Sequence, residues 1–79
     1  MNERKFAKVP IEFQRNGIKV VVLEYDSEDT KGYFLYLHET LEEEATFDEW
    51  YETIDIAVKA AKIHWGIAPK DWISENMTS

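Results

Sequence analysis

The chain has no cysteine among its 79 residues, so neither a disulfide nor a thiolate metal site can form. Its three glycines are isolated from one another, which excludes a glycine-rich phosphate loop. The longest aliphatic run covers only residues 20–23, far short of the ~20 apolar residues that a membrane-spanning helix needs. No apolar segment typical of a signal peptide follows the first residues, so we expect a cytoplasmic protein.

Basic residues are scarce where acidic residues are dense. Residues 24–55 hold twelve of the sixteen acidic residues and one basic residue, Lys31, giving a net charge of -11. The rest of the chain carries eight basic and four acidic residues, or +4, so the total is -7. Such a surface repels nucleic acid and anionic membranes and attracts basic partners. We therefore expect neither nucleic acid nor membrane as a partner.

An Asn-Gly pair at residues 16–17 predicts a tight β-hairpin, because a type I′ turn needs positive φ at both central residues. The hairpin places strands at about 8–15 and 18–25. Pro10 marks the first strand as a sheet edge, since proline donates no ladder hydrogen bond. Alternation puts Val21 and Leu23 on the face away from the core. The residues expected on the core face are Val9, Ile11, Phe13, Ile18, Val20 and Val22.

Two further strands are expected at about 32–38 and 45–52. In the first, alternation directs Leu35 and Leu37 into the core and Phe34 and Tyr36 to the opposite face. The acidic stretch 40–44 between the two strands is interpreted as a solvated hairpin loop, because it lacks the apolar stripe of a docked helix.

A helix is expected over about 54–65, with Thr53 as its N-cap and Gly66 just beyond its C-terminus. Its apolar arc is wider than one sheet face requires, since Ile56 and Ile63 lie roughly half a turn from the main stripe. Either of two elements could cover Ile56 and Ile63: a short tail turn at about 69–73, or a second copy of the protein. The main buried stripe is Ile54, Ala57, Val58, Ala61 and Trp65.

These elements predict a single α+β domain over residues 1–79. Its architecture is an antiparallel sheet of three to four strands with one C-terminal helix packed on one face and a short tail turn.

The sequence offers no constellation typical of catalysis. His38 and His64 are 26 positions apart with no metal-ligand spacing between them, so both are interpreted as structural. No serine lies in a nucleophile motif, and the run Glu42–Glu44 is interpreted as a solvated surface. We therefore expect no enzyme activity and no catalytic, cofactor-binding or metal-binding residues.

The second face of the sheet is the candidate partner surface. Apolar and aromatic side chains surrounded by acids are typical of protein-binding sites, unless another segment covers them. The candidate residues are Val21, Leu23, Phe34, Tyr36, Glu42, Glu43, Glu44, Asp48 and Glu49.

The chain resembles two groups of proteins. Gly32–Leu35, Trp50–Ile54, Ala57, Ala61, Trp65-Gly66 and Trp72 together resemble a pattern in short uncharacterised bacterial proteins, for which no activity is implied. Gly32-Tyr33 with Thr53–Ala57 and Ala61 is similar to the core of HicB-type antitoxins. That resemblance implies a sheet-plus-helix topology and no function, because the family's Pro-Asp-Leu-Pro-Gly segment is missing here.

The leading hypothesis is a small non-catalytic domain that binds another protein. The partner could be a basic protein, or the domain could form a homodimer. One alternative is an antitoxin- or immunity-type inhibitor that blocks a basic toxin with the acidic surface. Another is a small-molecule-binding protein with a pocket lined by Trp50, Trp65 and Trp72.

Overall fold

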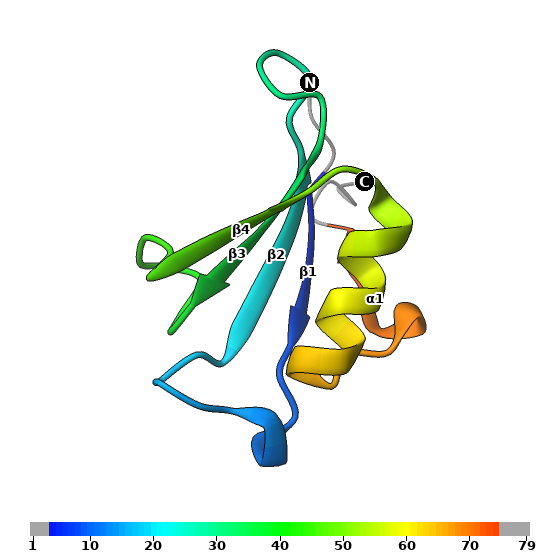
Figure 1. Ribbon diagram of the computed structural model, residues 1–79. Coiled ribbons are helices and arrows are strands. Elements are labelled where there is room, and N and C mark those ends of the chain that lie inside the picture. Colours follow the sequence, from blue (N-terminus) through cyan, green and yellow to red (C-terminus); the bar gives the residue numbers. More distant parts are fainter. Residues whose placement is uncertain (1–3, 75–79) are drawn as a thin grey trace.

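The computed structural model describes residues 4–74, which form a five-stranded antiparallel sheet with one α-helix on one face (Figure 1). The α+β class and the antiparallel sheet are thus confirmed, whereas the expected three to four strands were too few. The strands are β1 (Arg4–Lys8), β2 (Val20–Tyr25), β3 (Tyr33–His38), β4 (Phe47–Tyr51) and β5 (Ile73–Ser74). The helices are η1 (Ile11–Phe13, 3-10), α1 (Ile54–Trp65) and η2 (Pro69–Asp71, 3-10).

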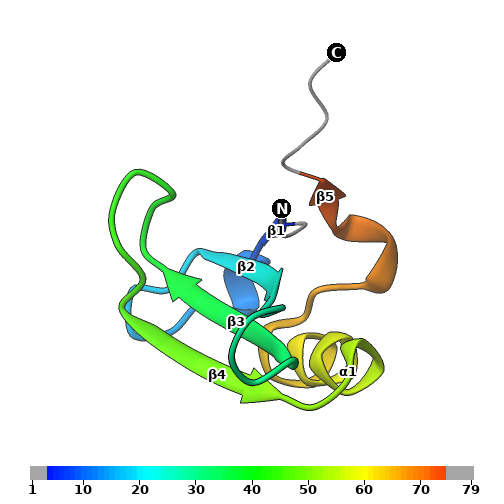
Figure 2. The ribbon, with the colours of Figure 1, turned by 90° about the horizontal axis from the view of Figure 1, so that it is seen from above.

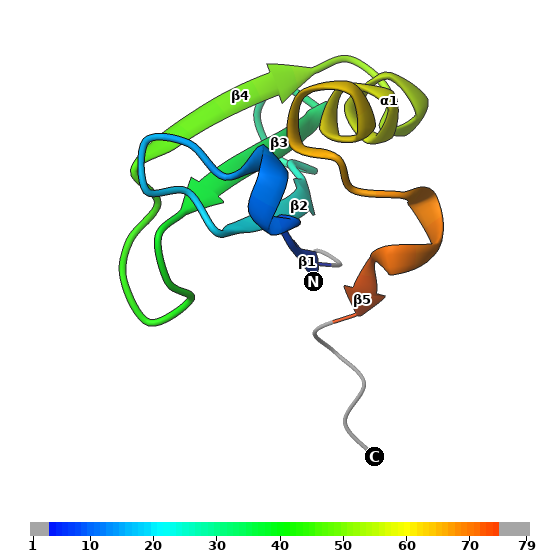
Figure 3. The same ribbon diagram turned by 90° about the horizontal axis from the view of Figure 1, so that it is seen from below.

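The strands lie in the order β4-β3-β2-β1-β5, so β4 forms one edge of the sheet and the two-residue β5 the other. Seen from above, α1 lies on one side of the sheet, and the loop between β3 and β4 lies at the far side of the molecule (Figure 2). Seen from below, the chain runs from α1 through η2 to β5, beside β1 (Figure 3).

The expected first strand at 8–15 is wrong. β1 lies earlier, where Arg4 to Lys8 pair with Glu24 to Val20, and the chain then leaves the sheet. Pro10 begins the turn of η1, in which the Phe13 N–H donates to the Pro10 carbonyl at 2.8 Å. β1 is also an inner strand, because β5 covers part of its outer side.

The Asn16-Gly17 turn exists, but it closes only one bridge, Arg15 to Ile18. Asn16 and Gly17 have φ of 54° and 79°, as a type I′ turn requires. Residue 19 belongs to no strand, and Ile18 and Val21, which are three positions apart, both lie in the core, so the alternation slips by one residue. A slip of one exchanges the two faces of a strand.

Val21 and Leu23 of β2 therefore lie in the core, where Val20 and Val22 were expected. Val20 and Val22 lie on the opposite face of the sheet, across from Lys8 and Phe6 of β1. Leu35 and Leu37 of β3 lie in the core as expected. The core-facing expectations for Ile11 and Phe13 were wrong, since both are exposed in η1. The buried cluster is Ala7, Val9, Ile18, Val21, Leu23, Leu35, Leu37, Ala57, Ala61, Trp65 and Ile67.

α1 begins and ends at the residues that the sequence indicated. The Thr53 hydroxyl accepts the Ile56 N–H at 3.2 Å, and Gly66 ends the helix with a φ of 68°. The Phe13 ring packs against Gly66, where a Cβ would lie 2.4 Å from it. Arg15 donates to the His64 carbonyl at 2.7 Å, and its guanidinium lies 4.1 Å from the centre of the Trp65 ring.

The described part of the tail, residues 67–74, leaves the outer side of α1 exposed. Ile56 and Ile63 remain 49% and 62% exposed, while Trp72 packs against the core cluster instead. Pro69 does begin a short turn, as expected, and that turn leads into β5. Within residues 4–74, no helix is both long and apolar enough to cross a membrane.

Candidate functional site

We call the sheet face opposite α1 the open face. Strand register brings its side chains into rows across the sheet, because directly opposed residues of paired strands point to the same side. Phe6 lies opposite Val22, Val22 opposite Tyr36, and Tyr36 opposite Asp48, with Ile73 beyond Phe6. The neighbouring row is Arg4, Glu24, Phe34 and Trp50.

The open face has an apolar floor. Val22 is fully buried there, although no α-helix within residues 4–74 covers this side. Its larger neighbours Phe6 and Tyr36 are half-buried. Phe34 and Tyr36 stack with ring centroids 5.4 Å apart and planes 20° from parallel. The outer margins remain accessible, with Trp50 44% and Ile73 51% exposed.

Carboxylates surround the stacked pair. A pocket of about 250 Å³, which we call the acidic-aromatic pocket, is lined by Glu24, Tyr25, Asp26, Asp29, Phe34 and Tyr36. Partial burial raises the pKa of the Tyr36 hydroxyl, and the nearby charges of Glu24, Asp48 and Asp26 raise it further. The open face therefore has a negative potential around its aromatic residues.

Asp26 folds the loop that carries one wall of this pocket. One of its carboxylate oxygens accepts the N–H groups of Glu28 and Asp29, both at 3.3 Å. The other oxygen accepts the N–H and the hydroxyl of Thr30, at 3.2 and 3.1 Å. The hydrogen bond from the Thr30 N–H is the main cause that lowers the pKa of Asp26, so this exposed carboxylate stays ionised.

Trp50 joins β4 to the same loop. Its indole N–H donates to the Thr30 hydroxyl at 2.7 Å, and that hydroxyl donates to Asp26. The ring lies on Gly32, where a Cβ would come within 2.3 Å of it. Gly32 is thus required for the close approach of the indole, and Trp50 fixes the loop beside the open face.

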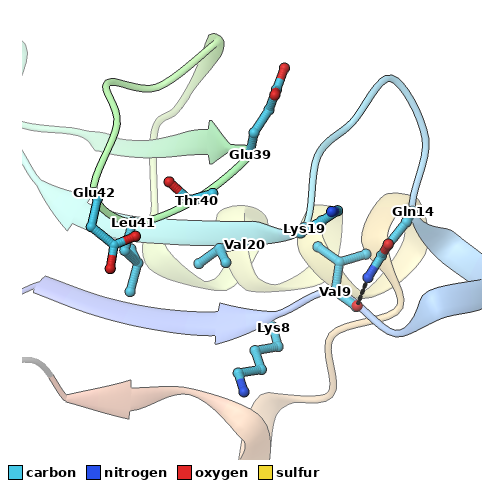
Figure 4. A pocket seen from close by; sticks show the side chains of 9 residues that line it. All are labelled: Lys8, Val9, Gln14, Lys19, Val20, Glu39, Thr40, Leu41 and Glu42. Atoms are coloured by element: carbon cyan, nitrogen blue, oxygen red, sulfur yellow. Dashed lines mark hydrogen bonds between the residues drawn. The ribbon is translucent and has the colours of Figure 1, made fainter.

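The loop between β3 and β4 borders the other end of the open face. It forms a pocket of about 430 Å³ with β1 and β2, in which Leu41 and Glu42 extend from the loop over β2, on the side of Val20 (Figure 4). His38 is buried and holds the loop through its Nδ1, 3.0 Å from the Glu43 carbonyl oxygen. Glu42, Glu43 and Glu44 are exposed.

Three of the candidate surface residues lie on the α1 side of the sheet instead of the open face. Val21 and Leu23 are 0% and 3% exposed and pack in the core, because of the slip in alternation before β2. Glu49 lies on the α1 side of β4, opposite Leu35. Phe34, Tyr36 and Asp48 do share the open face. Phe6, Val22 and Trp50 also belong to the open face, although the sequence pattern did not indicate them as surface candidates.

Glu49 instead partners Tyr51. The Tyr51 hydroxyl donates to the Glu49 carboxylate at 2.8 Å. Burial, with this hydrogen bond and the Glu49 charge as further causes, raises the pKa of Tyr51 to about 12.

A high-pH titration tests this pair. The unfolded chain ionises its tyrosines near the ordinary pKa of 10, whereas folded Tyr51 keeps its proton until about 12. The protonated phenol therefore stabilises the fold fully below pH 10, and this stabilisation is lost as the pH rises toward 12. We expect Tyr51→Phe to reduce the fall in urea midpoint between these two pH values. Equal falls in the two proteins would contradict the assignment.

Among the described residues, the three tryptophans lie apart in the fold. Trp50 lies against Gly32 on the loop beside the open face, whereas Trp65, the last residue of α1, is buried in the core and Trp72 packs against the core cluster. None of the three pockets of residues 4–74 described in this structure is lined by all three tryptophans, and the small-molecule-binding alternative stays a prediction. In the part of the chain that the structure describes, no group of three histidine or carboxylate side chains is placed to hold a metal ion.

Comparison of the chain with family models, curated proteins and solved structures gave no match. The two resemblances therefore stay predictions, and the geometry of the open face is the remaining guide to function.

Proposed function

We propose that the protein is a non-catalytic binding module that docks a basic segment of a protein partner on the open face. The observation that carries the proposal is the combination of an accessible aromatic floor, formed around Phe34 and Tyr36, with the carboxylates of Glu24, Asp29 and Asp48 beside it. Exposed aromatic patches support protein interfaces, and complementary charge selects and steers the partner.

Charge favours a basic partner over a second copy of the protein. Face-to-face pairing of two open faces would bring together surfaces from a chain with net charge -7. Arg4 already pairs with Glu24, at 3.5 Å, which reduces the positive charge that the open face can offer to another copy. A basic toxin would be one partner of this kind, so an inhibitor function is a special case of the same proposal.

The test is selection of peptides of about 12 residues from a random display library. We expect the recovered peptides to combine arginine or lysine with a large apolar residue. Their affinity should fall about tenfold or more between about 50 and about 300 mM NaCl, because screening weakens exposed charge pairs. Amide NMR shifts should map binding to β2, β3 and β4.

A charge reversal with a matched control separates this surface from general acidity. Asp48→Lys, on the open face, should reduce affinity for the selected peptides about tenfold or more. Asp71→Lys makes the same charge change in η2, which lies beyond α1 in the chain, and should have little effect. Peptides without basic residues, or equal losses in the two variants, would contradict the proposal.

A further inference from the structure

We propose that the acidic-aromatic pocket is a subsite for one arginine side chain of the partner. This inference rests on the proposed function and adds the identity of the anchoring group. The pocket volume of about 250 Å³ is below the ~300–1,000 Å³ of sites for drug-sized molecules, so it suits a single side chain.

The stacked rings supply one half of the recognition. Phe34 and Tyr36 are two residues apart on β3, so both rings stand on the open face, and both line the pocket. A cation within about 6 Å of an aromatic ring face is attracted by the electrons of the ring. A planar guanidinium also stacks on such a face, which an ammonium cannot do.

Two carboxylates supply the other half. Asp26 cannot serve as a direct ligand, because both of its oxygens already accept hydrogen bonds from the β2–β3 loop. It contributes negative charge and sets the position of Asp29. The exposed Asp29 carboxylate and Glu24 are then the acceptors at the pocket, and a guanidinium donates to carboxylates with the geometry that they prefer.

The protein already binds one guanidinium beside this pocket. Arg4 lies opposite Glu24 in the register of β1 and β2, with its Nε 3.5 Å from a Glu24 carboxylate oxygen. Phe34 is the next residue in the same row. A partner's arginine would approach the Glu24 carboxylate from the opposite side, over β3. There the aromatic rings of Phe34 and Tyr36 would flank it, whereas Arg4 lies on the β1 side.

The probe is N-acetyl-arginine amide, titrated into the whole protein and followed by amide NMR shifts. We expect saturable shifts at Glu24, Asp29, Phe34 and Tyr36, with a Kd on the order of millimolar for so small a ligand. N-acetyl-lysine amide should bind about fivefold or more weakly, and the uncharged N-acetyl-citrulline amide should give no saturable shifts.

Two variants and one control test the residues. Asp29→Asn and Tyr36→Leu should each weaken the arginine probe about fivefold or more, since one removes the acceptor charge and the other the ring. Glu43→Gln removes one charge in the β3–β4 loop, away from the pocket, and should leave affinity unchanged. Asp29 is exposed, so Asp29→Asn tests the subsite even if Tyr36→Leu disturbs folding.

The outcomes distinguish this inference from the proposed function. Equal shifts with arginine and lysine probes, or shifts centred on Glu42–Glu44, would overturn the arginine subsite. If selected peptides bind the open face and replacement of their arginines by citrulline has no effect, the subsite is wrong and the proposed function stands. If the arginine probe fills the pocket and no basic peptide binds, the proposed function fails and the subsite stands.

Discussion

Ala61→Asp is expected to unfold the protein. Ala61 is fully buried where α1 packs on the sheet, so the new carboxylate would enter the core without a partner. Burial of an unpaired charge costs several kcal/mol, and a domain of this size has a stability of roughly 5 kcal/mol. The expected result is loss of the cooperative thermal transition and of dispersed amide NMR signals.

Ile63→Asp is the matched control, because it introduces the same charge in the same part of α1. Ile63 is largely exposed, so its replacement should cost only about 1 kcal/mol, mostly from the unfavourable charge near the helix C-terminus. If Ala61→Asp also melts cooperatively within a few degrees of the natural protein, the packing of α1 described above is incorrect.

Gly32→Ala has the second large expected effect. A Cβ at this position would lie 2.3 Å from the Trp50 ring, so the indole must move away. Its hydrogen bond to Thr30 would then break, and the loop held by Asp26 would lose one attachment. Overpacking of this kind costs about 1–3 kcal/mol, which thermal or urea unfolding will measure.

A double-mutant cycle identifies the cause of this loss. In a Trp50→Ala background the obstructing ring is gone, so adding Gly32→Ala should be neutral or should stabilise by about 0.4–1 kcal/mol through the unfolded chain. The backbone of Gly32 does not require positive φ, so no strain is expected from alanine itself. A similar penalty in both backgrounds would place the cause elsewhere than in the Trp50 contact.

Local signals in the sequence predicted the parts of the fold that depend on neighbouring residues. Thr53 and Gly66 define the ends of α1, since each satisfies a hydrogen-bonding or conformational need within a few residues. Asn16 and Gly17 predicted their turn for the same reason. Leu35 and Leu37 were placed correctly because β3 alternates without interruption.

Which face each β2 residue occupies depends on the whole segment between β1 and β2, and was therefore predicted wrongly. The Asn16-Gly17 turn predicts a register only if both strands continue from it, and Pro10 together with η1 prevents this. The resulting slip reversed the roles of Val21 and Val22. β1 gave a weak signal, because among its five residues only Ala7 is fully buried.

The face of each candidate residue was predicted correctly on β3 and wrongly on β2. Phe34 and Tyr36 share the open face as the alternation of β3 indicated, and Asp48 lies opposite Tyr36. Phe6 was missed because β1 shows no apolar alternation: Arg4, Phe6 and Lys8 share one face of the strand, and Lys5 and Ala7 share the other. The role of Trp50 could not be predicted from the sequence, because it depends on the contact between its ring on β4 and Gly32 just before β3.

β4 forms an edge of the sheet and carries Asp48 and Glu49, with Glu52 just beyond its end. Two molecules that joined through this edge would bring like charges into direct opposition, which disfavours growth of the sheet into a continuous ribbon of molecules. The same carboxylates thus protect the exposed edge of the sheet against strand-by-strand association with further copies of the protein.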